Sequence, residues 1–289
     1  MPGTVEVRTP DGRILVAHAT SPSSSDVATL VWHHGSPHTG AQLAPVVDAA
    51  CARGLRVVTY ARPGYGGSPR TPGRDVASAA DDVAATLETL GIARDTPVVT
   101  MGASGGGPHA LACAALLGDE GGFQVRAAAT FAGLAPFDGT DEWFGGMRSD
   151  QALRAAARGV AAREAYALTE EWDPQVFTTA DWAALEGPWR ALGEDAGRAS
   201  ETDDGGLVDD DVAFVSPWGF APTTVQVPVL LVHGSLDRIV PAAHTDRLAR
   251  VLSDREVWVR PEDGHVSVLG ALPDALDWLL AQAGKPRQG

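Results

Sequence analysis

Lysine is nearly absent from this chain, and positive charge of any kind is scarce. The 289 residues carry 22 Lys and Arg against 37 Asp and Glu, a formal net charge of −15, and Lys285 is the single lysine. A protein that binds a phosphate backbone needs a basic face to displace the counterions. The composition therefore excludes a nucleic-acid-binding protein, and it disfavours an anionic membrane surface for the same reason.

Long apolar runs and cysteines are also scarce. No stretch reaches the roughly 18 consecutive apolar residues of a membrane span, and the first residues lack the basic and apolar regions of a signal peptide. We therefore expect a soluble, cytoplasmic protein with no membrane partner. The two cysteines, Cys51 and Cys113, lie in alanine-rich helical patterns, which predicts small buried thiols and no disulfide.

Short apolar runs, by contrast, recur along the chain. Hydrophobic residues make up 44% of the sequence, enough for a sizeable core. Continuous apolar runs typical of strands covered on both faces alternate with helical patterns, and a Pro/Gly turn joins two further strands into an edge hairpin. The expected strands span residues 5–8, 13–18, 28–33, 55–60, 97–103, 125–132, 227–233 and 256–259. Repeated βα units predict an α/β fold with a mostly parallel, eight-stranded sheet flanked by helices.

This alternation stops between residues 136 and 216. The segment has helical patterns without a good parallel-strand candidate, and from residue 137 onward it holds 18 of the 37 acidic residues but only six arginines. We predict a helical subdomain, residues 136–216, inserted after the sixth strand into a core formed by residues 1–135 and 217–289. The acidic run at 201–211 is most simply a solvated, mobile loop, because like charges repel one another and resist packing.

The candidate reactive element is a strand that breaks into glycines around one serine. The strand 97–103 ends in a G-x-S-x-G pattern formed by Gly102, Ser104 and Gly106. The two glycines lack the Cβ atoms that would clash when the turn forces Ser104 into a strained conformation. Such a turn places the serine hydroxyl at the carboxyl edge of the sheet, where parallel α/β proteins have their sites.

A serine nucleophile needs a base and an orienting carboxylate, and both are found after later strands. His265 follows the last predicted strand, and Asp237 follows the one before it. The chain order Ser, Asp, His is the order that accompanies a strand-to-helix elbow. Asp237 is also a candidate helix N-cap, and Asp138 or Asp141, just past the preceding strand, is the alternative acid.

Five other histidines are explained either by structural roles or by contact with a substrate. His33 and His233 lie inside apolar strands, where packing accounts for them, and His109 lies in the helix after the elbow. His34 and His38 flank the loop after the strand 28–33 and are candidates for contact with a substrate. A structural role for His34 agrees equally well with its position.

Together these motifs resemble those of the α/β-hydrolase fold family. The resemblance covers nearly the whole chain, and the matching motifs are His34-Gly35-Ser36-Pro37, Arg62-Pro63-Gly64-Tyr65-Gly66-Gly67-Ser68, the Ser104 elbow, Asp237-Arg238-Ile239-Val240-Pro241 and Gly264-His265. It implies that Ser104 is the nucleophile, His265 the general base and then acid, and Asp237 the residue that fixes the imidazole tautomer. It also implies an oxyanion hole formed by the backbone N–H groups of Ser36 and Gly105.

Two positions refine the activity that the resemblance implies. Many relatives have an aspartate before the Arg-Pro-Gly motif, where this chain has Ala61, so any role of that carboxylate is absent. Epoxide hydrolases and haloalkane dehalogenases of this fold use an aspartate nucleophile, so Ser104 argues against those activities. We expect a serine hydrolase that forms an acyl-enzyme, acts on a carboxylic ester or lactone of small to medium apolar type, and needs no metal or cofactor.

In this family an inserted helical segment forms a cap over the active site. Its tryptophans, Trp143 and Trp218 among them, are candidates for lining a substrate pocket or for forming the cap's own core. Acids such as Glu142, Glu170 or Glu171 are candidates for binding a substrate ammonium, as in related proline iminopeptidases. The alternatives to an esterase are thus an iminopeptidase-like aminopeptidase and a non-hydrolytic lyase or ligand-binding protein. The expected partner is a small-molecule substrate, and the sequence agrees with a monomer or a homodimer.

Overall fold

One eight-stranded sheet runs through the protein in the computed structural model, which describes residues 3–118, 122–201 and 205–285. The strand order is β1-β2-β4-β3-β5-β6-β7-β8; β2 is antiparallel to both of its neighbours, and the pairs from β4 to β8 are parallel. The strands are β1 (Gly3–Arg8), β2 (Ile14–Ala19), β3 (Ala28–His33), β4 (Leu55–Tyr60), β5 (Pro97–Ala103), β6 (Gln124–Phe131), β7 (Val229–Gly234) and β8 (Arg255–Arg260). The predicted fold class is confirmed.

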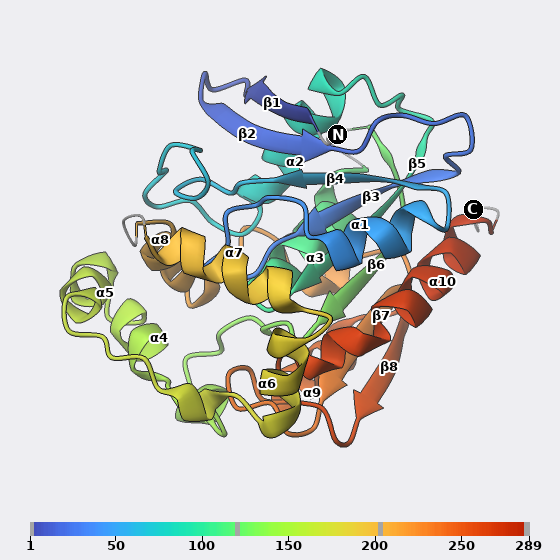
Figure 1. The fold of residues 1–289 in the computed structure, drawn as a ribbon. Coiled ribbons are helices and arrows are strands. Elements are labelled where there is room, and N and C mark those ends of the chain that lie inside the picture. The colour runs from blue at the N-terminus through green and yellow to red at the C-terminus, as the bar shows by residue number, and fades with distance from the viewer. Residues whose placement is uncertain (1–2, 119–121, 202–204, 286–289) are drawn as a thin grey trace.

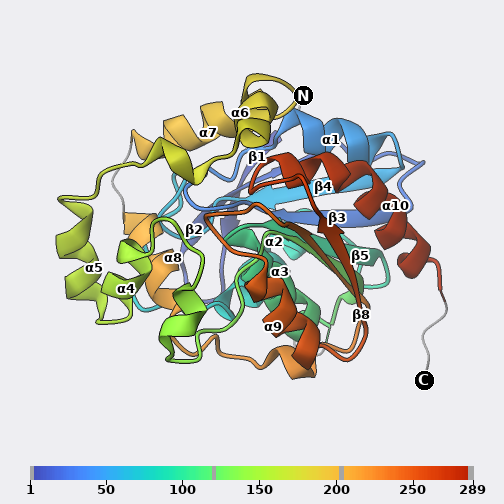
Figure 2. The same cartoon turned by 90° about the horizontal axis from the view of Figure 1, so that it is seen from below.

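Helices cover both faces of this sheet, as Figures 1 and 2 show. One face is covered by α1 (Ala44–Cys51) and α10 (Leu272–Ala283), and the other by α2 (Ser78–Thr89), α3 (Gly106–Leu116) and α9 (Ala243–Val251). Strands β3 and β7 are buried along their whole length because they have helices on both sides. This explains why their sequences read as continuous apolar runs.

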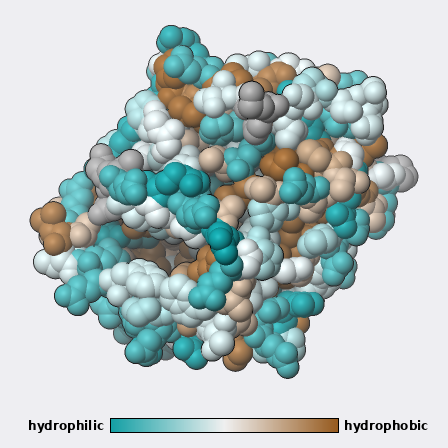
Figure 3. Space-filling view, in the orientation of Figure 1, coloured by the Kyte–Doolittle hydropathy of each residue, from teal (hydrophilic) through white to brown (hydrophobic). Residues whose placement is uncertain are grey.

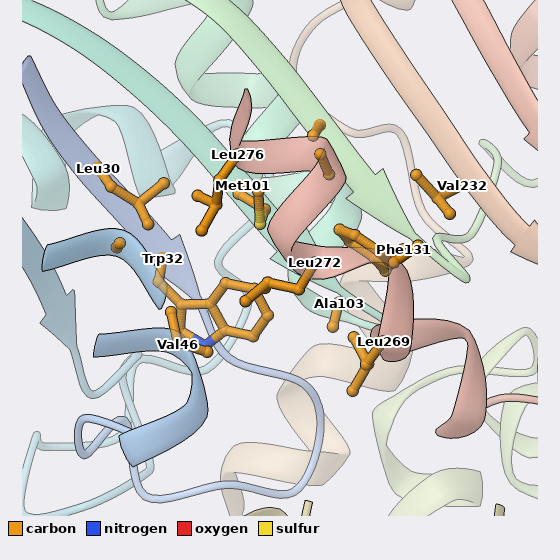
Figure 4. Close-up of a cluster of buried hydrophobic side chains, with 14 of the residues drawn as sticks. Leu30, Trp32, Val46, Met101, Ala103, Phe131, Val232, Leu269, Leu272 and Leu276 are labelled. Carbon is orange, nitrogen blue, oxygen red and sulfur yellow. The ribbon is translucent and has the colours of Figure 1, made fainter. Parts of the chain in front are cut away.

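The largest hydrophobic cluster lies between the sheet and the helices α1 and α10. Trp32 of β3 is 1% exposed and packs in this cluster with Val46 of α1 and Leu272 of α10, as Figure 4 shows. The same figure shows the strand residues Leu30, Met101, Phe131 and Val232 on the side of the sheet that faces α10, which carries Leu276. This packing fixes the sheet beneath the loops that follow β3 and β5.

Between β6 and β7 the chain forms helices without a strand in the described residues. We call residues 136–216 the inserted segment, and Figures 1 and 2 show its helices gathered at one side of the molecule. The elements of the inserted segment are a 3-10 turn (Asp141–Phe144), α4 (Gln151–Ala156), α5 (Val160–Ala167), a second 3-10 turn (Pro174–Val176), α6 (Thr179–Glu186), α7 (Arg190–Ser200) and α8 (Gly205–Phe214). Two more 3-10 turns lie outside it: Pro222–Thr224 before β7 and Ser267–Ala271 after β8. The spacing of apolar residues predicts one helix over 149–168 and another over 179–192; the structure divides the first at Gly159 and the second at Gly187-Pro188.

The acidic run at 201–211 was predicted to be a solvated, mobile loop, and for its described part this prediction was wrong. Residues 202–204 lie outside the described residues. From Gly205 onward the run forms α8, and three consecutive aspartates on it are buried. Successive helical residues point about 100° apart, so each carboxylate can meet its own arginine. The pairs are Asp209 with Arg70 at 2.9 Å, Asp210 with Arg62 at 2.7 Å and Asp211 with Arg163 at 2.6 Å.

The two cysteines differ in their exposure to solvent. Cys113 is buried in α3, whereas Cys51 is exposed at the end of α1, so the expectation of a buried thiol holds only for Cys113. Along the described part of the chain, no helix combines the length and the apolar character that crossing a membrane requires.

Leu276 provides a test of the core between the sheet and α10. Its side chain is fully buried, so Leu276→Ala should lower the free energy of unfolding by about 2–5 kcal/mol, from lost burial and the cavity left behind. The matched control is Leu168→Ala, because Leu168 is 87% exposed and its truncation should change stability by about 0.5 kcal/mol or less. Urea unfolding followed by circular dichroism measures both, and equal losses would contradict the packing described here.

Candidate active site

Ser104 lies in a strained turn between β5 and α3. Its φ of 53° falls in the left-handed region that side chains avoid, and its N–H donates to the Phe131 carbonyl at 2.8 Å. The glycines on either side are required by close backbone contacts. A Cβ at Gly102 would lie 2.1 Å from the Gly106 carbonyl oxygen, and one at Gly106 would lie 2.1 Å from that of His33. The predicted elbow is therefore present, with Ser104 at the carboxyl edge of the sheet.

His265 and Asp237, predicted to work with Ser104, are in direct contact with each other. His265 Nδ1 lies 2.7 Å from Asp237 Oδ2, and the other oxygen of Asp237 accepts the N–H groups of Ile239 at 2.8 Å and Val240 at 3.0 Å. Because Asp237 accepts, His265 Nδ1 carries the proton and Nε2 is left as the basic nitrogen.

The alternative acids lie elsewhere. Asp138 is bound by Arg247, and Asp141 forms an ion pair with Arg154 at 2.6 Å. Neither residue lines the cavity that contains Ser104. The structure therefore brings Asp237, and not these two, to His265.

The ionisation of the His265–Asp237 pair follows from burial and charge. Burial lowers the pKa of His265, but the charge of Asp237 outweighs that effect, and the pKa lies above its usual value. Burial also penalises the Asp237 carboxylate, yet His265 and His233 stabilise it enough to hold the pKa of Asp237 below its usual value. Asp237 is thus ionised at neutral pH and favours the protonated imidazole that would form when His265 accepts a proton.

Three other histidines have positions set by buried hydrogen bonds. His33 Nε2 lies 3.0 Å from Thr100 Oγ1, and His109 Nδ1 lies 2.7 Å from the Gly105 carbonyl oxygen. His233 Nε2 donates to the Val240 carbonyl at 2.7 Å and so supports the loop that carries Asp237. Burial lowers the pKa of His33 to about 3 and that of His109 well below its usual range, so both are neutral.

Ser104 and His265 open onto one cavity of about 730 Å³. Figure 3 shows the surface hollowed on the side of the inserted segment, with apolar residues inside the hollow. The wall is mostly apolar and comes from both the sheet loops and the inserted segment; it includes Trp32, Leu134, Leu153, Val176, Phe177, Trp182, Leu185, Leu192, Leu207, Phe214, Ile239, Val240 and Leu269. Volume and lining are typical of small-molecule sites, which span about 300–1,000 Å³.

The two predicted oxyanion donors line this cavity as well. Within the described residues, the backbone N–H groups of Ser36 and Gly105 make no hydrogen bond in the protein. A Cβ at Gly105 would lie 2.6 Å from Ser36 Oγ, so the two donors belong to adjoining segments. Both groups are therefore free to bind a ligand atom beside Ser104.

The four predicted substrate contacts divide into two pairs. His34 and His38 line the cavity. Trp143 and Trp218 do not, because their rings are buried in a neighbouring apolar cluster and their indole N–H groups donate to backbone carbonyls at 3.0 and 3.1 Å. Other aromatic residues of the inserted segment take the place at the cavity: Trp172, Phe177 and Trp182, whose rings contact one another edge to face.

Five carboxylates line the cavity, and most are neutralised within the protein. Glu170 and Asp211 both bind Arg163, at 3.0 and 2.6 Å. The other pairs are Asp173 with Arg148 at 2.6 Å and Asp195 with Arg198 at 3.0 Å. Only Glu171 has no ion pair within the described residues, and Glu142 lies outside the lining.

Asp211 differs from the other cavity carboxylates in its ionisation. Burial raises the pKa of Asp211 to about 7, although Arg163 opposes this effect. The Asp211–Arg163–Glu170 group therefore carries at most one net negative charge, and protonation of Asp211 lowers it further. This leaves little net negative charge there to bind a cation.

Sequence reasoning missed a set of buried aspartates that hold the loops of the site. Asp181 of α6 accepts the N–H groups of Val266 and Ser267, each at 2.8 Å, and so fixes the loop that carries His265. Asp195 of α7 accepts the Thr39 N–H at 3.0 Å. The one local signal was the capping box of Thr178 and Asp181, which the structure contains. Nothing in the sequence shows that these carboxylates reach another part of the chain.

No metal centre accompanies these groups in the described residues: nowhere there do three or more His, Cys, Asp or Glu side chains form a cluster able to hold an ion.

The His265–Asp237 contact predicts a measurable titration. By NMR, the His265 imidazole should titrate above its usual value of 6.5, and Asp237→Asn should move the midpoint below that of the wild type, because burial then acts unopposed. Asp138→Asn, at the alternative acid, is the matched control and should leave the midpoint unchanged. An unchanged midpoint in Asp237→Asn would contradict the pairing.

Comparison with known proteins agrees with this geometry. The family model described as "Alpha/beta hydrolase family" matches residues 30–277. Comparison with curated protein sequences gives no match. Among solved structures, a thermophilic esterase from Thermogutta terrifontis has a TM-score of 0.72 at 19% identity, covering 98% of this chain and 100% of the other.

Two further solved structures share the fold over nearly their whole length. A bromoperoxidase from Bacillus anthracis has a TM-score of 0.73 at 20% identity, covering 96% of this chain and 100% of the other. An enol-lactonase from Burkholderia xenovorans LB400 has a TM-score of 0.68 at 21% identity, with the same coverage of 96% and 100%. The family model matches most of the chain, and the strand order, the elbow and the paired His265 and Asp237 agree with it: the protein belongs to the α/β-hydrolase family.

Proposed function

We propose that this protein hydrolyses carboxylic esters or lactones through an acyl-enzyme on Ser104. The observation that carries the proposal is the joint placement of three groups at one cavity: an elbow serine, a histidine bound to a buried carboxylate, and two free backbone N–H groups. This is the set of groups that acyl transfer to water requires. Relatives of the same fold include esterases and an enol-lactonase.

In the proposed reaction, His265 Nε2 accepts the Ser104 hydroxyl proton as the oxygen attacks the carbonyl carbon. The resulting oxyanion accepts hydrogen bonds from the Ser36 and Gly105 N–H groups, each of which supplies about 3 kcal/mol in comparable enzymes. His265 then protonates the leaving alcohol oxygen as the C–O bond breaks. Water attacks the acyl-enzyme, its proton passes to His265, and the carboxylic acid leaves as the Ser104 oxygen regains a proton.

The cavity supports a small to medium apolar substrate. Its wall is rich in Leu, Val, Trp and Phe side chains, and its volume of about 730 Å³ accommodates both sides of an ester. Trp172 and Trp182 are 63% and 37% exposed, so their rings are available to an aromatic or aliphatic group entering from solvent. Short and medium-chain esters are therefore the first substrates to test.

The aminopeptidase alternative receives less support from the site. A substrate ammonium needs an unpaired carboxylate, and four of the five cavity carboxylates already bind Arg side chains. Glu171 is exposed to solvent, where an ion pair contributes only about 0–1 kcal/mol. We therefore rank neutral esters above aminoacyl amides.

Ser104→Ala tests the proposal directly. The wild type should hydrolyse p-nitrophenyl acetate and butyrate, and Ser104→Ala should lower kcat by roughly 10⁴-fold or more, because the nucleophile is removed. Ester, lactone and prolyl or alanyl anilide hydrolysis are compared by stopped-flow and end-point assays.

A serine-directed phosphonate adds the control for this experiment. It should label the wild type at Ser104, as located by mass spectrometry, and leave Ser104→Ala unlabelled. Ester turnover that persists in Ser104→Ala would refute the proposed nucleophile. Labelling without ester or lactone turnover would favour the aminopeptidase activity or a non-hydrolytic role instead.

The pH dependence of kcat/KM should report His265. The base must be neutral, so kcat/KM should rise as pH increases through the His265 pKa, with a midpoint above its usual value of 6.5. Asp237→Asn should shift this midpoint downward and lower kcat by roughly 10⁴-fold, since the imidazolium loses its counter-charge and its tautomer is no longer fixed. A midpoint near the ordinary carboxyl pKa would contradict the role of His265.

A further inference from the structure

Asp210 lies at the centre of a buried charge cluster that joins the inserted segment to residues 34–37, which we call the oxyanion loop. Its carboxylate accepts Arg62 Nη2 at 2.7 Å, Arg74 Nη2 at 2.5 Å and Tyr65 Oη at 2.9 Å, and it also accepts the Ser36 hydroxyl. Burial disfavours the charged form, but the two guanidinium groups outweigh this and hold the pKa of Asp210 well below its usual range. Asp210 is therefore a fixed negative charge beside the oxyanion loop.

The direction of the Ser36 N–H depends on the carbonyl of the same peptide. The peptide between Gly35 and Ser36 is planar and trans, so its N–H points away from its C=O. The Gly35 carbonyl is held by His34 Nδ1 at 2.6 Å and by Arg62 Nη2 at 3.2 Å. His34 donates through Nδ1 because its Nε2 accepts the Arg62 backbone N–H at 3.2 Å. These two donors hold the carbonyl and so fix the direction of the Ser36 N–H.

The Gly105 donor is held differently. Its N–H shares a peptide with the Ser104 carbonyl, which accepts the Gly107 N–H at 2.9 Å inside the elbow. Backbone geometry alone thus fixes the Gly105 N–H. The Ser36 N–H, in contrast, depends on side chains that come from other parts of the chain.

Arg62 keeps its position only with a counter-charge. The side chain is 1% exposed and also donates to the His34 carbonyl and, at 3.0 Å, to Ser36 Oγ. A buried guanidinium without a partner is strongly unfavourable, and here Arg74 adds a second positive charge at the same carboxylate. Loss of the Asp210 charge would leave two arginines to repel each other beside the oxyanion loop.

We propose that Asp210 is a positioning residue for the oxyanion hole. It binds the Ser36 hydroxyl directly and holds Arg62 against the Gly35 carbonyl, and both contacts keep the Ser36 N–H directed at the cavity. The inference rests on the proposed function, because an oxyanion hole acts only where a tetrahedral intermediate forms. It gives α8 of the inserted segment a part in stabilising the transition state, besides its part in enclosing the substrate.

Asp209 on the same helix offers a matched control. It is buried and bound by Arg70 at 2.9 Å, but within the described residues it makes no hydrogen bond to the oxyanion loop. Asp210→Asn should lower kcat by roughly 10–100-fold with KM within about threefold, since one donor of the hole is misdirected rather than deleted. Affinity for a trifluoromethyl ketone, whose adduct with Ser104 carries an oxyanion, should fall by the same factor. Asp209→Asn should change all three quantities by less than about threefold, and equal effects in the two variants would overturn the proposal.

A second pair of variants leaves the charge cluster intact and so remains informative if Asp210→Asn does not fold. Ser36→Ala and Tyr65→Phe each remove one hydrogen bond to the same oxygen of Asp210, and only Ser36 carries the proposed donor. Ser36→Ala should lower kcat and trifluoromethyl ketone affinity by about tenfold, and Tyr65→Phe by less than about threefold. Thermal melts check that both variants are folded. Equal effects of the two substitutions would again overturn the proposal.

The wild type separates the failure of this inference from that of the proposed function. A wild-type protein that neither hydrolyses esters or lactones nor reacts with the phosphonate refutes the proposed function, and the inference falls with it. An active wild type with an unaffected Asp210→Asn variant refutes the inference alone.

Discussion

Buried carboxylates of the inserted segment bind the loops around Ser104, and the geometry of the site depends on these contacts. Asp181 accepts two backbone N–H groups beside His265, Asp195 accepts the Thr39 N–H, and Asp210 binds Ser36 and Arg62. The inserted segment is therefore more than a cover over a finished site. The loops after β3 and β8 have their positions fixed by side chains from α6, α7 and α8.

Such contacts do more for geometry than for stability. Removing charges from water costs several kcal/mol per ion, and the attraction between buried partners offsets this only when the geometry is good and the remaining hydrogen-bonding groups are satisfied. In the Asp210 cluster the geometry is good, since four side chains donate to one carboxylate, although among the described residues Arg74 Nε is buried without a hydrogen-bond partner. Hydrogen bonds to charged groups are directional, so these donors favour one arrangement of the oxyanion loop.

The same carboxylates change the meaning of the acidic composition. Most of the net charge of −15 lies in the inserted segment, which suggested either a solvated surface or a site for an ammonium group. In the structure, buried aspartates are paired with arginines or with backbone N–H groups, and the wall of the cavity is mainly apolar. This combination favours a neutral substrate, which agrees with the proposed ester hydrolysis.

Local sequence determined the sheet and its elbow. Continuous apolar runs predicted the strands, and the glycines around Ser104 were readable because only glycine fits where Gly102 and Gly106 meet neighbouring backbone. Chain order also pointed to Asp237 and His265, since parallel strands bring their carboxyl ends to one edge. What local pattern could not supply was any contact between side chains distant in the sequence. Trp143 and Trp218 looked like candidates for the pocket but lie outside it, while Trp172 and Trp182 line it.

The acidic run on α8 shows most directly what only the tertiary structure decided. Read by itself, Asp209-Asp210-Asp211 predicts repulsion and a solvated loop, because its partners are not nearby in the sequence. Arg62 and Arg74 come from the loop region after β4, more than a hundred residues earlier, and folding brings them to Asp210. Hydrophobic periodicity is a local property and was therefore legible from the sequence. Charge compensation is a property of the folded chain, so only the structure could show that these aspartates are buried and which loop they hold.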